Sequence, residues 1–232
     1  MTEKIIIQAK NIHRYFQSLH VLKGVDLEVK ESEILSLVGA SGAGKTTLLQ
    51  ILGTLDEPSL KTPLNQPIVS ELRMNGASLI GKKDQELAKF RNQNIGFIFQ
   101  FHHLIPEFDV TENVMLPALI TNQNKREIKQ RAEELLVYLG LQERLTHAPK
   151  NLSGGEQQRV AVARALINQP KVVLADEPSG NLDTHTAENL HELFFKLRDE
   201  FGQTFVIVTH NEELANMADR KLTMVDGNIV TE

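Results

Sequence analysis

The sequence contains no cysteine, no long apolar run and no excess of positive charge. Without cysteine, the chain can form neither a disulfide nor a cysteine-based zinc site, and this composition fits a reducing compartment. No apolar segment approaches the roughly 20 residues that a membrane-spanning helix requires. The first ten residues, MTEKIIIQAK, lack the apolar stretch of a signal peptide. If the protein works at a membrane, we therefore expect a partner to carry it there.

The balance of charge also restricts the function. The formal net charge is −5 at pH 7, whereas broad nucleic-acid binding depends on clustered lysine and arginine. We therefore expect no nucleic-acid partner. The chain has 232 residues, of which 41% are hydrophobic. That is enough for one large domain, or for a core with a small subdomain.

Strand-like segments occupy the two outer thirds of the chain. Two segments near the N-terminus are typical of antiparallel strands, and a third apolar run follows them. Two later segments are continuous apolar runs typical of a parallel sheet buried on both faces. The predicted strands are residues 5–7, 21–29, 34–38, 172–175 and 205–208. Together with the helical stretches that flank them, they predict an α/β fold.

The middle of the chain differs from its outer thirds. Residues 125–139 and 156–166 show the periodicity of helices. We therefore expect a helical subdomain at about residues 102–165. It would be inserted into a core formed by residues 1–101 and 166–232, so that the whole chain makes one domain.

Residues 39–46 read GASGAGKT and match the phosphate-binding pattern GxxxxGK[ST]. A strand-like run precedes them and a helix-like stretch follows at residues 47–52, which is the context that the motif requires. The glycines allow a tight turn whose N–H groups converge on phosphate oxygens at a helix N-terminus. Lys45 supplies a cation for the β- and γ-phosphates, and Thr46 a hydroxyl for Mg²⁺. The predicted phosphate contacts are Gly39, Ala40, Ser41, Gly42, Ala43, Gly44, Lys45, Thr46 and Thr47. The alternative is a glycine-rich turn without a ligand, but the context favours a nucleoside triphosphate.

Two acids follow the apolar run that begins at residue 172. The sequence VVLADEP places Asp176 and Glu177 at the carboxyl end of a buried strand, where α/β folds bind ligands. Asp176 can hold Mg²⁺ opposite Thr46, directly or through water, and Glu177 can act as a general base toward an attacking water. The alternative is a pair of solvated acids that end the strand. The phosphate loop upstream favours the catalytic interpretation.

The segment NLSGGEQQR at residues 151–159 contains the start of a helix. Ser153 can cap this helix, and Glu156, three residues later, completes a capping box. That structural interpretation does not explain the adjacent Gly154 and Gly155. They leave the helix N-terminus open to close approach by an anion.

Taken together, these motifs resemble those of the ATP-binding cassette (ABC) ATPases, whose signature motif is similar to LSGGEQQR. Other elements of the family occur in the same order: Gln100 at the Q-loop position, SGNLD at residues 179–183 at the D-loop, and His210 at the switch position. The resemblance extends over nearly the whole chain. It implies a P-loop NTPase core with an N-terminal antiparallel β subdomain and an inserted α-helical subdomain. It also implies an ATPase that uses ATP and Mg²⁺.

The resemblance assigns a role to several side chains near the nucleotide. Phe16 matches the position whose aromatic ring stacks on adenine. Adjacent Tyr15 is the alternative register, and simple packing at a strand end is the structural explanation. Gln100 is expected to contact Mg²⁺ and the attacking water, and His210 is expected to bond the γ-phosphate.

In this family the signature motif completes the ATP site of a second protomer. The residues expected to contact ATP on the partner are Ser153, Gly154, Gly155 and Glu156. Asp183 is expected to act across the same interface. A chain with one copy of each motif should therefore form a head-to-tail homodimer that encloses two ATP molecules.

One region narrows the choice within the family. Residues 100–114, QFHHLIPEFDVTENV, follow the Q-loop, where ABC ATPases meet their membrane partner. They resemble the group that serves lipoprotein-releasing complexes of the LolCDE type, as do residues 91–97 and 174–183. MacB-type exporters and FtsE-type complexes are the nearest alternatives. The resemblance implies a peripheral ATPase on the cytoplasmic face of a bacterial inner membrane, bound to permease subunits of the LolC/LolE type.

We expect the permease to dock at residues 101–105, in a groove between the core and the helical subdomain. Phe101, Leu104 and Ile105 offer apolar contacts there, suited to a short helix of the partner. The same residues could instead form an ordinary, partly buried turn. The two adjacent histidines in this segment have no third ligand beside them, which argues against a metal site.

Residues 57–71 depart from the family pattern. They contain Pro58, Pro63 and Pro67, little periodicity and no glycine. The segment therefore predicts an extended loop in place of a short turn, and it puts the local hairpin in doubt.

A second class of function remains to be compared. Soluble ABC ATPases that act on DNA or ribosomes generally carry a coiled-coil insertion, a zinc module or two fused cassettes. This chain has one cassette, no cysteine and no room for a coiled coil, so the membrane class is preferred. Because Glu177 and His210 are both present, a scaffold without ATPase activity is disfavoured.

Overall fold

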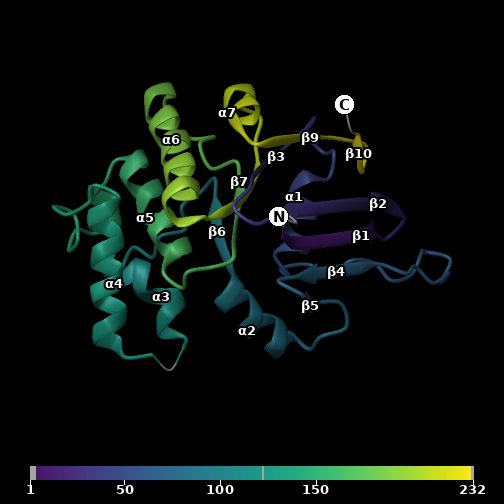
Figure 1. Cartoon of the computed structure of the whole chain (residues 1–232), viewed down its shortest axis with the longest axis horizontal. Coiled ribbons are helices and arrows are strands. Elements are labelled where there is room, and N and C mark those ends of the chain that lie inside the picture. Colours follow the sequence, from purple (N-terminus) through teal and green to yellow (C-terminus); the bar gives the residue numbers. More distant parts are fainter. Residues whose placement is uncertain (1–3, 122, 231–232) are drawn as a thin grey trace.

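A six-stranded sheet forms the centre of the computed structural model, which describes residues 4–121 and 123–230 (Figure 1). Its strands are β3 (Ile34–Val38), β6 (Ile95–Phe99), β7 (Val172–Asp176), β8 (Thr204–Val208), β9 (Arg220–Val225) and β10 (Asn228–Val230). They lie in the order β10-β9-β3-β8-β7-β6, and all neighbours are parallel except β10 and β9. Every residue of β3 and β8 is buried, as expected for strands that are covered on both faces. The three central strands predicted from apolar runs are thus present.

A four-stranded antiparallel sheet precedes this core. It contains β1 (Ile5–Phe16), β2 (Leu19–Lys30), β4 (Glu71–Met74) and β5 (Ala77–Ser78), in the order β2-β1-β4-β5. Along β2, residues after position 24 alternate between buried and exposed, the pattern of a sheet with one face against the core. The predicted N-terminal pair of strands is confirmed, with Ala9 opposite Leu27 in its register.

Helices cover the central sheet and form a separate group at one side of the molecule, where α3, α4 and α5 lie together (Figure 1). The helices are α1 (Lys45–Leu52), α2 (Asp84–Asn94), α3 (Val110–Leu119), α4 (Lys125–Tyr138), α5 (Gly154–Leu166), α6 (Thr184–Phe201) and α7 (Glu212–Met217), with a 3₁₀ turn at Pro149–Asn151. The two helices predicted in the middle of the chain are present, and α5 begins two residues earlier than its periodicity indicated. The division into a core and a helical subdomain at residues 101 and 166 stays an interpretation, and its outer bounds at residues 1 and 232 lie outside the described residues.

Alternate residues of the central strands pack into two different hydrophobic clusters. Val173 and Phe205 join the cluster formed with α3 to α6, whereas Leu174 and Val206 join the cluster formed with α1 and the antiparallel sheet. Because neighbouring side chains of a strand point to opposite faces, each central strand contributes residues to both clusters. Helices α3 to α6 are therefore held on one face of the central sheet, and α1 with the antiparallel sheet on the other.

The segment at residues 57–71 forms the expected extended loop, with a short antiparallel turn in its middle. An isolated bridge joins Lys61 to Pro67, and the Ile68 N–H donates to the Leu60 carbonyl at 2.8 Å. Backbone and hydroxyl hydrogen bonds attach both ends of the loop to β1. A local hairpin therefore forms without glycine.

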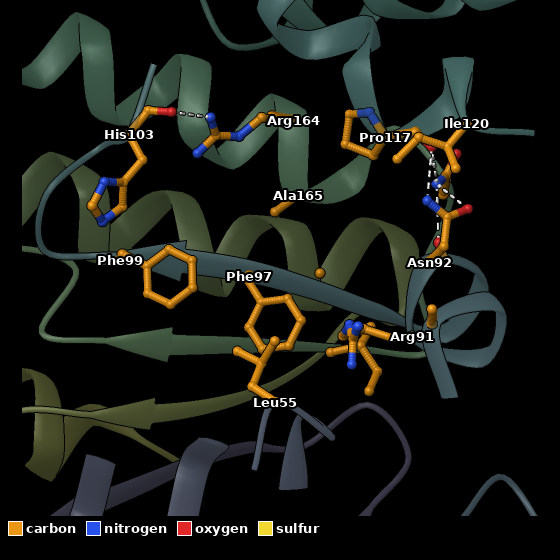
Figure 2. A pocket seen from close by; sticks show the side chains of 14 residues that line it. Leu55, Arg91, Asn92, Phe97, Phe99, His103, Pro117, Ile120, Arg164 and Ala165 are labelled. Atoms are coloured by element: carbon orange, nitrogen blue, oxygen red, sulfur yellow. Dashed lines mark hydrogen bonds between the residues drawn. The ribbon is translucent and has the colours of Figure 1, made fainter. Parts of the chain in front are cut away.

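A cavity of about 560 Å³ lies between β6 and the helices α2, α3 and α5 (Figure 2). We call this cavity the groove. Its lining residues are Leu55, Ala88, Arg91, Asn92, Ile95, Gly96, Phe97, Phe99, His103, Pro117, Ile120, Arg164, Ala165 and Asn168. Most of the contact surface is apolar, and the rings of Phe97 and Phe99 stack with their centroids 5.8 Å apart.

The structure corrects the predicted lining of the groove. Of residues 101–105, all of which are described, only His103 lines it. Leu104 packs instead against the helical hydrophobic cluster, while Phe101 and Ile105 are exposed outside the lining. The reason is a backbone turn, because His103 has φ 48° and places its ring edge-on to Phe99.

Within residues 4–121 and 123–230, none of the helices combines the length and the apolar character needed to cross a bilayer.

Gly96→Ala should destabilise the fold by about 1–3 kcal/mol, the usual cost of overpacking a core. A Cβ atom at Gly96 would lie 2.5 Å from the carbonyl oxygen of Ala165 in α5, so helix or strand backbone would have to move. Gly154→Ala is the matched control, because its Cβ would meet only Leu182 at an ordinary 3.7 Å and alanine favours the helix. Denaturant unfolding should separate the two variants. A Gly96→Ala protein as stable as the native one would contradict tight packing of β6 on α5.

Candidate functional site

The phosphate loop joins β3 to α1 and is held in a conformation that needs glycine. Gly39 has φ 148° and Gly44, the N-cap of α1, has φ 104°. A Cβ atom at Gly39 would collide with the Met224 carbonyl of β9. The backbone therefore turns closely against the sheet, and the N-terminus of α1 faces the loop, where an anion is favoured.

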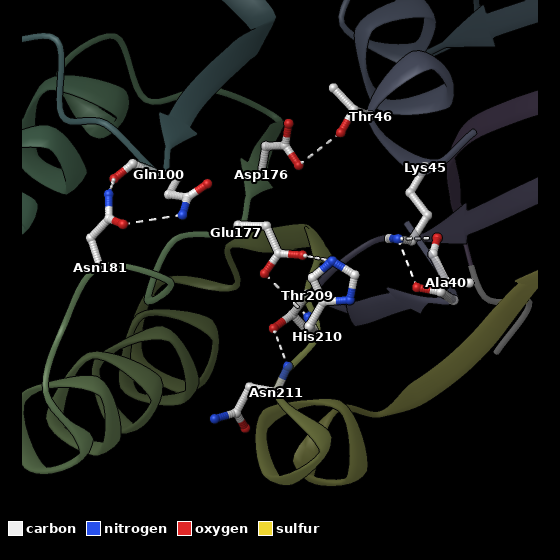
Figure 3. A network of polar contacts seen from close by, with 11 residues as sticks. Ala40, Lys45, Thr46, Gln100, Asp176, Glu177, Asn181, Thr209, His210 and Asn211 are labelled. Atoms are coloured by element: carbon white, nitrogen blue, oxygen red, sulfur yellow. Dashed lines mark hydrogen bonds and ion pairs between the residues drawn. The ribbon is translucent and has the colours of Figure 1, made fainter. Parts of the chain in front are cut away.

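Lys45 is the first residue of α1 and is only 6% exposed. Its ammonium group donates to the carbonyls of Gly39 at 2.7 Å and of Ala40 at 2.9 Å. Burial lowers the pKa of Lys45 from its ordinary value, although Glu177 and Asp176 act in the opposite direction. An ammonium group has three donors, and these contacts hold it inside the curve of the loop (Figure 3).

Asp176 and Glu177 lie at the carboxyl end of β7, beside the loop (Figure 3). The Thr46 hydroxyl donates to Asp176 Oδ1 at 3.3 Å, so two of the three predicted metal ligands lie within hydrogen-bond distance of each other. Burial raises the pKa of Asp176 and of Glu177 above their ordinary values. Two partly desolvated carboxylates therefore face a buried ammonium group at the same edge of the sheet.

His210 follows the end of β8 and contacts Glu177 twice. Its Nε2 lies 3.1 Å from Glu177 Oε1, and its backbone N–H donates to Glu177 Oε2 at 3.2 Å. Glu177 itself has φ 47°, an uncommon backbone conformation for a residue with a side chain. The structure thus brings together Lys45, Thr46, Asp176 and His210 around this carboxylate.

Gln100 directly follows β6 and is fixed by a neighbour that the motif analysis did not single out. Its Nε2 donates to Asn181 Oδ1 at 3.1 Å, and Asn181 Nδ2 donates to the Gln100 carbonyl at 3.1 Å (Figure 3). Asn181 is the central residue of the SGNLD segment, which was the only sequence signal that could have pointed to it. This reciprocal pair orients Gln100 beside the acids.

The signature segment begins α5 with the predicted capping box. The Ser153 hydroxyl accepts from the Glu156 N–H at 3.3 Å, and Glu156 Oε2 accepts from the Ser153 N–H at 2.7 Å. Arg144 donates to Glu156 at 2.8 Å and lowers the pKa of that carboxyl to about 2. The structural interpretation of Ser153 as an N-cap is therefore confirmed, and Gly154 and Gly155 remain in the first turn.

The signature segment does not reach the phosphate loop of its own chain. Among the described residues, no hydrogen bond or ion pair joins residues 153–156 to residues 39–47. The segment instead lies next to the start of α6, where Gly155 packs close to Thr186. Asp183 caps α6 by accepting from Thr186, and this hydrogen bond lowers the pKa of Asp183.

The aromatic pair at the end of β1 is divided between two environments. Tyr15 stacks on His20 with ring centroids 3.9 Å apart. Phe16 is 46% exposed, with the Arg14 guanidinium 4.6 Å from its ring centroid. A ring that is already stacked is less available to a base, which favours Phe16 over Tyr15 as the adenine platform.

The donor set fits Mg²⁺. This ion prefers oxygen ligands and is usually held by one or two carboxylates together with substrate phosphates. Thr46 and Asp176 offer such oxygens within hydrogen-bond distance of each other, and Gln100 lies next to them (Figure 3). Among the described residues, no cluster of three or more histidines, cysteines or acids exists that could hold a metal without a phosphate.

This geometry is that of a phosphate-loop ATPase. A family model described as "ABC transporter" matches residues 22–180, which is more than half of the chain. The chain therefore belongs to the ABC transporter family, and the predicted P-loop core with its antiparallel and helical parts is confirmed.

Within the family, the chain is similar to curated proteins named LolD. It is 57% identical over 224 residues to the lipoprotein-releasing system ATP-binding protein LolD of Bacteroides thetaiotaomicron, covering 97% of this chain and 99% of that protein. It is 54% identical over 228 residues to LolD of Porphyromonas gingivalis, covering 98% and 100%. The chain is thus an ABC ATP-binding subunit close to LolD.

Solved structures agree with the fold. The dimeric structure of MJ0796, a bacterial ABC transporter cassette, superposes with a TM-score of 0.84 at 38% identity, covering 97% of both chains. A dimeric post-hydrolysis state of the same cassette, bound to ADP and Pi, gives a TM-score of 0.84 at 37% identity. CbiO1 from Clostridium perfringens, part of an ABC transporter complex, gives 0.87 at 25% identity and covers 99% of this chain and 88% of that one.

Glu177→Gln should lower ATP turnover by about 100-fold or more, because the amide cannot accept a proton as a general base. ATP affinity should remain within a few-fold of native, since the phosphate loop is unchanged. Lys45→Ala should show the opposite pattern and lose most of its affinity for ATP, because the phosphates lose their main side-chain cation. Turnover and binding of a fluorescent ATP analogue, measured side by side, separate the two variants. Native turnover in the Glu177→Gln protein would remove Glu177 from the role of base.

Proposed function

We propose that this chain hydrolyses ATP as the ATPase subunit of an inner-membrane complex that releases lipoproteins toward the outer membrane. The observation that carries the proposal is its full-length similarity to LolD, in a chain whose Lys45, Asp176, Glu177 and His210 meet at one edge of the sheet. Similarity of that extent favours lipoprotein release over MacB-type export and FtsE-type complexes. It also favours a membrane complex over a soluble ATPase that acts on nucleic acid.

The hydrolysis step uses residues that already lie together. The loop N–H groups and the Lys45 ammonium hold the β- and γ-phosphates. Glu177 accepts a proton from the attacking water, whose oxygen bonds to the γ-phosphorus while the bond to the bridging oxygen of ADP breaks. The raised pKa of Glu177 brings this base closer to neutral pH, where proton transfer is effective. The His210 backbone N–H holds the carboxylate, and the His210 imidazole donates to the γ-phosphate.

Thr46, Asp176 and Gln100 would hold Mg²⁺ through oxygen atoms. When bound, the ion neutralises negative charge on the phosphates. Gln100 is already oriented by its reciprocal pair with Asn181, and it also reaches the attacking water. Phe16 stacks on adenine.

The second half of each ATP site comes from another copy of the chain. Residues 153–156 have no bond to their own phosphate loop, yet they present two glycines in the first turn of α5, which suits an anion. The dimeric MJ0796 cassettes support a pairing of two subunits. In a head-to-tail homodimer, the signature of one protomer covers ATP on the other, and Asp183 lies at the same interface.

The permease docks in the groove of about 560 Å³. Phe97, Phe99 and Leu55 give it an apolar floor, while Ile120 is 79% exposed at its side. A short apolar helix from a permease subunit of the LolC/LolE type fits such a groove. Exposed Phe101 adds apolar contact. It belongs to residues 101–105, which we call the groove segment. The subunit would thereby sit on the cytoplasmic face of the inner membrane without crossing it.

Ser153→Arg should abolish ATP-driven dimerisation, because the bulky side chain would face the γ-phosphate of the partner. ATP binding by the monomer should survive, since Ser153 lies apart from its own phosphate loop. The Glu177→Gln background stabilises the ATP-bound dimer and makes the effect visible by light scattering with ATP and Mg²⁺. Equal loss of monomeric ATP binding would count against a site shared between protomers.

Ile120→Glu and Phe101→Glu should abolish co-purification of the permease from detergent-solubilised membranes, because each places a charge on an apolar docking surface. Val69→Glu is the matched control: Val69 is 86% exposed but belongs to the loop at residues 57–71. Thermal unfolding of all three variants tests whether they remain folded. If Ile120→Glu and Phe101→Glu still retain the permease, the docking site lies elsewhere.

The complex itself tests the function. A tagged chain should carry its permease subunits with it, identifiable by mass spectrometry. The reconstituted complex should then release a labelled lipoprotein from proteoliposomes with ATP, and a Glu177→Gln complex should not. Active ATP hydrolysis without a membrane partner or without lipoprotein release would overturn the proposal while leaving the ATPase assignment intact.

A further inference from the structure

A buried glutamine connects the groove segment, residues 101–105, with the backbone that directly follows Glu177. Gln158 lies in α5, is fully buried, and uses both ends of its amide. Its Nε2 donates to the Pro178 carbonyl at 2.6 Å, and its Oε1 lies 2.5 Å from His102 Nδ1. A carbonyl oxygen can only accept, so Pro178 fixes the orientation of the amide. The oxygen of Gln158 must then accept from His102, whose Nδ1 carries the proton.

One end of this connection is the backbone next to the general base. Pro178 directly follows Glu177, whose φ is 47°. A residue before proline is normally extended, and a positive φ is uncommon for glutamate. Such a conformation persists only where its surroundings hold it. Through its hydrogen bond to the Pro178 carbonyl, the Gln158 amide is one of the groups that hold this backbone conformation.

The other end is the segment that follows Gln100. Arg164, also in α5, donates to the backbone carbonyls of His102 at 2.6 Å and His103 at 2.7 Å. Both Arg164 and His103 line the groove. Helix α5 therefore attaches to this segment at two points, with Gln158 on the catalytic side and Arg164 on the groove side.

We infer that Gln158 is a positioning residue for Glu177, and that with His102 it transmits displacements of the groove segment to the catalytic carboxylate. The inference rests on the proposed function in so far as the groove is taken as the permease site. The route runs through the α5 amide and the Pro178 carbonyl, so it is separate from the contact between Gln100 and Asn181. Any ligand that shifts the His102 backbone would change the angle at which Glu177 meets water.

A purely structural role would make Gln158 no more than a partner for a buried carbonyl. The two roles differ in what they change. A structural defect lowers stability and affects all activities together, whereas a positioning defect lowers turnover while ATP affinity stays the same. Substitutions of His102 add a second distinction. A side chain that can still donate a hydrogen bond to Gln158 should restore turnover, whereas one without a donor should not.

The test uses the isolated full-length chain. Gln158→Met keeps the side-chain length but removes the donor and the acceptor. We expect kcat to fall at least 10-fold, with the Kd for a fluorescent ATP analogue within twofold of native. His102→Phe should give a similar loss. His102→Asn should retain most of the turnover, because its amide N–H can still donate to Gln158. The double variant Gln158→Met with His102→Phe should lose no more than the larger single loss.

Hydrogen exchange provides a readout that needs no turnover. Exchange at the Gly180 N–H, which donates to the Glu177 carbonyl at 3.0 Å, should become faster in Gln158→Met and in His102→Phe but remain native in His102→Asn. Thermal unfolding midpoints identify any variant that fails to fold. If Gln158→Met fails to fold, the comparison of His102→Asn with His102→Phe decides the inference. Native exchange and native kcat in folded variants would overturn the inference, and so would equal losses in His102→Asn and His102→Phe. Absence of ATP hydrolysis in the native chain would instead refute the proposed function, and hydrogen exchange would still decide this inference.

Discussion

The register of the parallel strands is the constraint on which the rest of the site depends. Leu37 of β3 pairs with Val208 of β8, and Asp176 of β7 pairs with both Val208 and Phe99. The strands consequently end at the same level, and whatever follows each strand must meet its neighbours at one edge. Residues separated by more than a hundred positions in the chain become one site in this way. A shift of a single strand by one residue would turn its side chains to the opposite face and move its functional residue away.

Burial at this edge creates an electrostatic balance that suits catalysis better than stability. Lys45, Asp176 and Glu177 are all partly removed from water. Burial lowers the pKa of Lys45 and raises the pKa of Asp176 and Glu177, so the uncharged form of each residue is favoured. Loop carbonyls, a threonine hydroxyl and His210 compensate only part of this effect. Charges that are incompletely solvated by the protein interact strongly with an incoming phosphate and water. The unusual backbone at Glu177 belongs to the same pattern, in which local strain is retained at a functional site.

Much of the fold could be read from the sequence because its signals are local. The apolar runs predicted β3, β7 and β8 almost to the residue. The phosphate loop predicted a helix directly after it, and α1 begins two residues before the predicted stretch, at Lys45. The capping box at Ser153 was equally local. The contacts that sequence reasoning missed are tertiary. Asn181 faces Gln100 because Gln100 follows β6 and Asn181 lies a few residues after the neighbouring strand β7.

The exposure of side chains in the groove segment could not be predicted from the sequence either. Phe101 and Leu104 are both apolar, and no local pattern distinguishes the exposed ring of Phe101 from the partly buried side chain of Leu104. The distinction arises from the turn at His103, whose backbone carbonyl accepts from Arg164 in a helix 61 residues later in the chain. Gln158 likewise looks like an ordinary polar residue of a helix until its two partners are known.

The separation between residues 153–156 and the phosphate loop of the same chain has a genetic consequence. If each ATP site takes its loop from one copy and its signature from another, a defective copy also inactivates a site to which an intact copy contributes. A lesion in the loop and a lesion in the signature, carried on different copies, leave one composite site whole and place both faults in the other. Mutant alleles of this protein should therefore interfere with the wild-type allele when they are expressed together, and the loop and signature alleles should partly complement each other.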